Sequence, residues 1–171
     1  MQWYDLFLSL ISLRSFSVLW YWIALWFFWS VVTRRVLGVP GELAIRAQSD
    51  PRAAEEALWF ARFEVRRRMA VSAPRRMIAV TLLAFAASAL LTLALSGLEA
   101  AQALLPFLLP WILIEALRER LARRLMRDAP GAEALAGLLI WHKIAMQAIA
   151  GGTIFLTFIW GAWRNLSLLM P

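Results

Sequence analysis

Apolar and charged positions occupy long separate blocks along this chain. Four blocks are nearly free of charged side chains, and segments rich in arginine or in turn residues separate them. A helix needs about 20 consecutive apolar residues to cross the hydrocarbon core of a bilayer. The blocks therefore predict transmembrane helices over residues 16–32, 77–95, 103–117 and 138–163.

The segments outside these blocks predict two further helices. Residues 1–13 are apolar on one side but too short to span a bilayer, so we expect an interfacial helix there. Within the water-facing segment 34–76, Asp50 precedes Pro51, which is a typical helix start because the carboxylate caps the first turn. The helix that follows is amphipathic and is expected to lie along the inner membrane surface. The remaining polar parts are a second segment, 118–136, and a tail, 164–171.

The distribution of arginine predicts the orientation of the chain. Arginine makes up 17 of the 18 basic residues, and 15 of these arginines lie in the two polar segments 34–76 and 118–136. Basic residues near the ends of membrane helices collect on the cytoplasmic side. We therefore expect one all-α, multi-pass domain over residues 1–171, with both chain ends on the periplasmic side. The preference for arginine over lysine, with abundant alanine and leucine, suggests a GC-rich bacterial genome, so the expected location is the bacterial inner membrane.

Composition supports the membrane class. The chain is 62% hydrophobic, its mean hydropathy is +0.66 and its net charge is +7. The arginines border apolar spans and do not form the face of a soluble module, so anionic lipid head groups are expected partners and nucleic acid is not. The residues expected to contact lipid are Arg66, Arg67, Arg68, Arg75 and Arg76.

Candidate chemistry is sparse. The chain has no cysteine and one histidine, so it has no thiolate nucleophile and no ligand set for an iron–sulfur cluster. Phosphate-binding, dinucleotide-binding, hydrolase and zinc-protease motifs are absent from the sequence. We therefore expect a protein that is not an enzyme, with no catalytic residues and no metal.

Three polar side chains are expected inside or near the hydrocarbon. Glu115, His142 and Lys143 fall at similar depths of the third and fourth spans, and a charge at that depth costs about 2.5–3.5 kcal/mol unless it finds a partner. We predict that Glu115 pairs with His142 or Lys143. The pair would be structural, or part of a proton relay, or His142 would be the single axial ligand of a pigment.

Tryptophans and small residues mark candidate contact faces. Trp22, Trp26 and Trp29 form one stripe of the first span, which would meet a partner subunit, pack within the chain, or contact a quinone or another cofactor. No bound cofactor is expected, although contact with a pigment, haem or quinone stays open. Two seams of small residues allow close helix approach. They are formed by Thr81, Ala84, Ser88 and Thr92, and by Ala145, Ala148 and Gly152.

Residues 13–22 (LRSFSVLWYW) and 36–40 (VLGVP) resemble a family of small alphaproteobacterial inner-membrane proteins. Members of that family are often labelled as components of the Suf iron–sulfur assembly complex. The resemblance covers roughly the first 40 residues and transfers no functional residue. It implies a role in docking a cytoplasmic partner through the arginine-rich segment.

The sequence as a whole predicts a non-catalytic accessory or assembly subunit of a larger inner-membrane complex, with an energy-transducing complex as the expected host. Other integral membrane subunits would be its partners. Two alternatives stay open. One is a membrane anchor that recruits a cytoplasmic partner such as iron–sulfur assembly machinery. The other is a small membrane protein that conducts protons or a solute.

Overall fold

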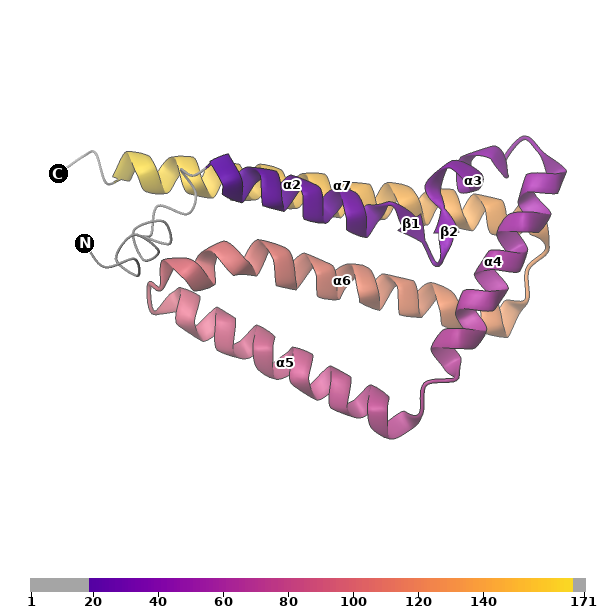
Figure 1. Ribbon diagram of the computed structural model, residues 1–171, viewed down its shortest axis with the longest axis horizontal. Coiled ribbons are helices and arrows are strands. Elements are labelled where there is room, and N and C mark those ends of the chain that lie inside the picture. Colours follow the sequence, from indigo (N-terminus) through magenta and orange to yellow (C-terminus); the bar gives the residue numbers. More distant parts are fainter. Residues whose placement is uncertain (1–18, 168–171) are drawn as a thin grey trace, which may run out of the picture.

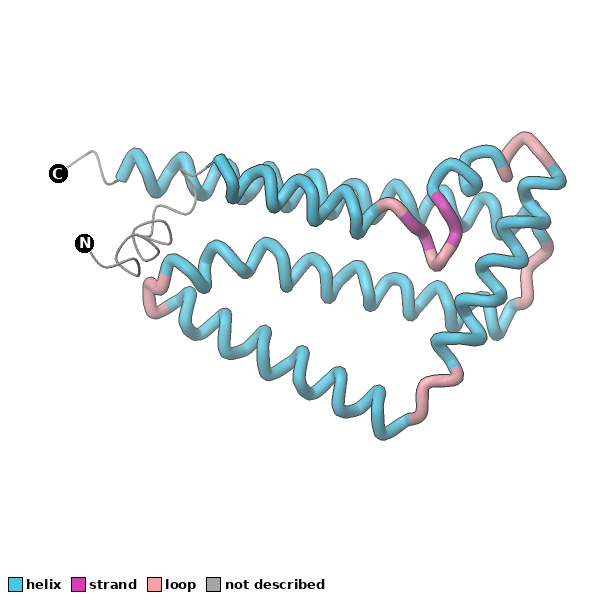
Figure 2. The backbone as a smooth tube through the Cα atoms, viewed as in Figure 1, coloured by secondary structure: helices cyan, strands magenta, loops and turns pink. Residues whose placement is uncertain are grey.

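The structure is a computed structural model that describes residues 19–167, and this part of the chain is almost entirely helical (Figures 1 and 2). The four helices that run lengthwise are α2 (Leu19–Thr33), α5 (Ala73–Leu95), α6 (Glu99–Asp128) and α7 (Ala132–Ser167). Figure 1 shows α4 (Pro51–Met69) and the short α3 (Gly41–Arg46) at one end of this arrangement. The predicted all-α class is confirmed.

Three of the four predicted spans coincide with helices that are long and apolar enough to cross a membrane, namely α5, α6 and α7. The described part of the first predicted span is α2, which has 15 residues. At about 1.5 Å per residue α2 is roughly 22 Å long, which is less than the ~30 Å of a hydrocarbon core. The described helices therefore give three spans where the sequence predicted four. The interfacial helix predicted over residues 1–13 lies outside the described residues.

Helices α6 and α7 extend well beyond the predicted apolar spans. Helix α6 continues through Pro106 and Pro110 to Asp128. Continuation is favoured because any backbone group left without a hydrogen bond in lipid costs several kcal/mol. Most of the polar segment 118–136 is also helical, and a short turn over residues 129–131 joins α6 to α7. Its first residue, Ala129, has a left-handed backbone with φ of 40°.

Helix α4 begins where the sequence predicted. The side chain of Asp50 accepts a hydrogen bond from the backbone N–H of Arg52 at 2.9 Å, and Pro51 occupies the first helical position. Three arginines in the last turn of α4 favour its C-terminal end, where the helix dipole is negative. Within α4, Arg68 Nε lies 3.0 Å from Glu64 Oε1, an ion pair at the favourable i,i+4 spacing.

A two-stranded hairpin, which the sequence analysis did not anticipate, connects α2 to α3. Strand β1 (Arg35–Val36) pairs antiparallel with β2 (Val39–Pro40), and Leu37 and Gly38 form the turn. Both turn residues have positive φ, 47° and 79°, as the tight hairpin turn that matches strand twist requires. Leu37 is 1% exposed, so its burial offsets the strain of a non-glycine residue in this conformation.

The apolar core lies at the end of the molecule where α4 crosses the long helices. It joins the second half of α2, the hairpin, the inner face of α4 and the adjoining parts of α6 and α7. In contrast, α5 packs mainly against α6, and only 6% of its most apolar segment is buried. An apolar helix can remain exposed in this way within a bilayer, because lipid chains are as apolar as leucine. The large side chains at the centre of the core are Leu25, Trp29, Leu37, Ile114, Leu135, Leu139 and Met146.

Candidate functional site

The most concentrated group of ionised side chains within the described residues lies where α4 meets α6. We call Glu64, Arg67, Arg68, Glu115 and Arg118 the carboxylate–arginine cluster. Arg68 bridges two carboxylates on different helices, with Nε 3.0 Å from Glu64 Oε1 and Nη1 3.1 Å from Glu115 Oε2. Arg67 Nη2 lies 2.8 Å from Glu64 Oε2. The cluster therefore joins α4 to α6 through charged hydrogen bonds, the stronger kind.

Arg118 extends this cluster to the end of α2. It forms an ion pair with Glu115 and donates hydrogen bonds to the backbone carbonyls of Val32 and, at 3.1 Å, Arg35. The last carbonyls of a helix have no partner inside the helix, and a cation placed there also meets the negative end of the helix dipole. Arg118 thus caps α2 and fixes the start of the hairpin against α6.

Gly38 lets the hairpin approach the cluster closely. A Cβ atom at this position would lie 2.9 Å from Glu64 Cβ, and the φ of Gly38 is +79°. A side chain here would therefore clash with Glu64 and strain the turn. The glycine places the hairpin directly over the buried carboxylate.

Burial and charge act in opposite directions on this carboxylate. Burial by itself raises the pKa of Glu64, but hydrogen bonds and charge from Arg67 and Arg68 outweigh it, and the net pKa lies below the ordinary value. Burial likewise lowers the pKa of Arg68, whereas Glu115 and Glu64 raise it above its ordinary value. Both groups are therefore held in their charged forms.

His142 and Lys143 contact other parts of the chain. Lys143 Nζ donates a hydrogen bond to the backbone carbonyl of Gly41 at 3.1 Å and so fastens α3 to α7. His142 is half-buried and hydrogen-bonds to the backbone of Leu117. Its Nε2 atom is buried without a hydrogen-bond partner among the described residues. The ring thus lies between α6 and α7.

The predicted pair of Glu115 with His142 or Lys143 is not present in the structure. Glu115 instead binds Arg68 and Arg118. The prediction failed because it considered only depth along two spans, whereas α4 folds across the same level and supplies an arginine. The i,i+3 spacing of Glu115 and Arg118 was the signal in the sequence that could have indicated the correct partner.

The tryptophan stripe divides between the interior and the surface. Trp29 is 2% exposed and belongs to the core, whereas Trp26 is 64% exposed. Trp22 is half-buried and packs edge-on against Phe158 of α7, with ring centroids 6.0 Å apart. Packing within the chain therefore accounts for Trp29 and much of Trp22. Of the three tryptophans predicted to contact a partner, only Trp26 has a largely exposed side chain.

The arginines predicted to contact lipid also divide into two groups. Arg67 and Arg68 bind Glu64, and Arg76 Nη1 lies 3.7 Å from Glu119 Oε1. Arg66 and Arg75 are exposed and form no ion pair with the described residues. The prediction treated all five as equivalent, whereas three of them have acidic partners, on α4 itself or on α6.

The first small-residue seam lies on the outside of the molecule. Thr81, Ala84, Ser88 and Thr92 are all exposed, whereas the half-buried and buried residues of α5 fall on the opposite face, around Leu90 and Ala94. Ser88 and Thr92 donate their hydroxyl hydrogen bonds to carbonyls of α5 itself, at 2.8 and 2.9 Å. The hydroxyl groups of Ser88 and Thr92 are therefore satisfied within α5, and the seam faces away from the rest of the described chain.

The arrangement supplies ion pairing and packing between α4, α6 and the hairpin. Both cluster carboxylates are held by arginines, and no group of three or more His, Cys, Asp or Glu residues among residues 19–167 is placed to hold a metal ion. Comparison of the chain with protein-family models, with curated proteins and with solved structures gives no match.

Proposed function

We propose that this protein is a non-catalytic accessory or assembly subunit of a larger bacterial inner-membrane complex, with an energy-transducing complex as the expected host. The observation that carries the proposal is the outer face of α5. This span packs mainly against one neighbour, α6, and presents its seam of small residues on the side away from that neighbour. Such seams allow two helix backbones to approach closely inside lipid.

The exposed seam favours a helix of another subunit over lipid. Lipid chains adapt to large and small side chains alike, so a seam of alanine, serine and threonine brings no advantage in contact with lipid alone. Association of membrane helices is driven by close packing, because both lipid and side chains are apolar. Ala84, Ser88 and Thr92 together extend about 12 Å along the helix axis, at 1.5 Å of rise per residue.

In this proposal α2 is part of a fourth span, and the arginine-rich end is cytoplasmic. Helix α2 runs alongside α7 (Figure 1) and is tied to it by the contact between Trp22 and Phe158. Arg34 and Arg35 directly follow its end, and α4 and the end of α6 bring their arginines to the same end of the molecule. One charged end and one nearly uncharged end fit the positive-inside rule with both chain ends in the periplasm.

The proposal is tested by purification from native membranes with a mild detergent. The tagged wild-type chain should recover a stoichiometric membrane partner, and Ser88→Leu should reduce that recovery because leucine fills the seam. Val80→Leu is the matched control, since Val80 is also exposed on α5 but lies off the seam. A solitary wild-type protein, or equal recovery with Ser88→Leu, would refute the proposal.

A second candidate is a membrane anchor that recruits a cytoplasmic partner, such as the iron–sulfur assembly machinery that the sequence resemblance implies. The observation that favours it is the outer face of α4, which carries exposed Trp59 and Phe63 beside unpaired arginines. Such a partner should be captured by the membrane-embedded protein and lost at high salt, because salt screens exposed charge contacts. Capture that resists salt would favour the membrane-subunit role.

A further inference from the structure

A cavity of about 540 Å³ lies between α4 and the end of α6, apart from the carboxylate–arginine cluster. We call it the α4 pocket. Its apolar wall includes Leu58, Trp59, Leu125 and Met126, and its charged side includes Arg62 and Arg66. The volume falls within the range of about 300–1,000 Å³ that is typical of small-ligand sites.

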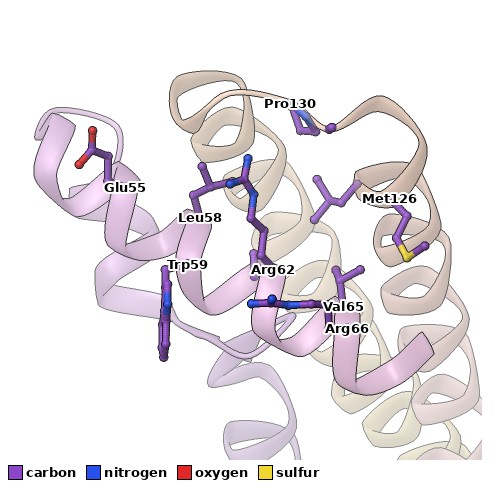
Figure 3. Close-up of a pocket in the computed structure, with 11 residues that line it drawn as sticks. Glu55, Leu58, Trp59, Arg62, Val65, Arg66, Met126 and Pro130 are labelled. Atoms are coloured by element: carbon purple, nitrogen blue, oxygen red, sulfur yellow. The ribbon is translucent and has the colours of Figure 1, made fainter. Parts of the chain in front are cut away.

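The charged side of the pocket has two cations without acidic partners. Arg62 and Arg66 are one helical turn apart on α4, so their Cα atoms are separated by about 6 Å along the axis. Neither forms an ion pair or hydrogen bond with the side chains of residues 19–167. Figure 3 shows Arg62 pointing toward the loop that carries Pro130, while Arg66 reaches back along α4 toward Trp59.

One acidic residue, Glu55, also lines the pocket. Figure 3 shows Glu55 nearer the start of α4 than Arg62 and Arg66, with its carboxylate pointing away from both guanidinium groups. Two arginines against one glutamate leave the lining with a net positive charge. An anionic group would therefore be attracted to the side of the pocket formed by Arg62 and Arg66.

The apolar wall of the pocket indicates that the rest of the ligand is a hydrocarbon. Trp59 is 60% exposed and Met126 is 57% exposed, although both face a cavity that a hydrocarbon chain could fill. Burying such surface is favourable by about 25 cal/mol for each Å² removed from water. Methionine also adapts its shape to irregular apolar ligands.

We propose that the α4 pocket binds an anionic amphiphile, with a phosphate or carboxylate head held by Arg62 and Arg66 and a hydrocarbon chain against Trp59 and Met126. The ligand comes either from the cytoplasmic leaflet, as an anionic phospholipid, or from solution, as a free single-chain acid. Arg62 was not among the arginines that the sequence marked for lipid contact. Arg66 was among them, but the pocket assigns it to a defined binding site, whereas the sequence assigned it only to general contact with lipid head groups.

The binding test uses the purified full chain in a neutral detergent. Native mass spectrometry and melting temperature are recorded with phosphatidylglycerol, with sodium laurate, with phosphatidylcholine and with inorganic phosphate. Retention of one phosphatidylglycerol or one laurate molecule, with a higher melting temperature, supports the site, and the stronger of the two names the source. An equal effect of phosphatidylcholine, or of inorganic phosphate alone, would overturn the proposal.

Variants separate the pocket from general surface charge. Arg62→Gln with Arg66→Gln should weaken binding about 25-fold, the product of roughly fivefold for each arginine near an anionic head group. The matched control is Arg52→Gln with Arg75→Gln, because both residues are exposed, lack ion pairs among the described residues and lie outside the pocket. Equal weakening by the two double variants would overturn the proposal.

A third variant probes the apolar wall without changing charge. Met126→Trp should fill the cavity and reduce retention of the hydrocarbon chain, while the melting temperature without ligand stays close to that of the wild type because Met126 is exposed. Unchanged ligand binding by Met126→Trp would show that the hydrocarbon chain of the ligand does not occupy the pocket.

Discussion

A single glycine decides how close the hairpin comes to the buried carboxylate of Glu64. Gly38 has a positive φ, and the neighbouring Glu64 side chain leaves no room for a Cβ atom at this position. Either requirement favours glycine, and the two together exclude a relaxed side chain. This position could not be recognised from the sequence, because the turn pair Leu37–Gly38 lacks the asparagine or aspartate that marks most hairpins of this type.

We expect Gly38→Ala to reduce the free energy of unfolding by about 1–3 kcal/mol, because left-handed strain and the contact with Glu64 act together. Gly137→Ala is the control, since a Cβ atom on that residue of α7 would meet nothing within 4 Å. That substitution should be neutral or stabilising, as alanine favours a helix over glycine. Melting temperatures of both purified variants distinguish these effects, and equal behaviour would contradict the strain argument.

The acid sensitivity of the fold should depend on Glu64. Because its pKa is lowered from the usual 4.5, the ionised carboxylate stabilises the folded state fully above that value. This contribution is lost as pH falls through the lower pKa of the folded state, since the unfolded state then binds more protons. The melting temperature of the wild type should therefore fall more steeply below about pH 4.5 than that of Glu64→Gln. Parallel curves for the two proteins would show that Glu64 does not contribute.

At the scale of single elements, residues that share one helix face by their spacing in the sequence can differ in burial. Trp26 and Trp29 share one stripe of α2, but only Trp29 is enclosed by the core. Spacing identifies the residues of one helix face, whereas their environment depends on which neighbours cover that face. The start of α4 was predictable because Asp50 and Pro51 act locally. The partners of Glu115 were not, because they depend on how α4 crosses α6.

Trp29→Ala should destabilise the protein by about 3–5 kcal/mol, as expected for removing a large buried aromatic side chain. Trp26→Ala should change the melting temperature little, because that side chain is open. If Trp26 contacts a partner subunit, its substitution will instead lower the recovery of that partner from native membranes. Equal destabilisation by the two variants would contradict the assignment of Trp29 to the core.

For the whole molecule, the alternation of apolar and charged blocks predicted the all-α class and most of the helices. The number of described spans and the contacts between helices became evident only in the three-dimensional structure. Charge-free blocks identify apolar helices wherever they occur, so α5, α6 and α7 were all found. The full length of α6 was less evident from the sequence. Each proline removes a hydrogen bond from the helix, whereas the cost of unpaired backbone groups in lipid favours its continuation.

The proposed topology can be measured with single cysteines, because the natural chain has none. Ser96→Cys lies in the exposed turn between α5 and α6, and Ser49→Cys lies in the exposed turn before α4. In spheroplasts, a membrane-impermeant maleimide should label position 96 directly and position 49 only after the membrane is opened. The reverse pattern would invert the orientation.

The contacts that close the arginine-rich end also impose an order on biosynthesis. The hydrogen bond from Lys143 to Gly41 joins residues 102 positions apart, and the contact from Arg118 to Val32 joins residues 86 positions apart. During translation, α2, the hairpin and α4 emerge long before the helices that cover them. The inner face of α4, with Ala57 and Ala61, must therefore wait for Leu135 and Leu139 of the last helix. Until then the nascent chain displays an uncovered apolar surface at its arginine-rich end, the kind of surface that chaperones and quality-control proteases recognise.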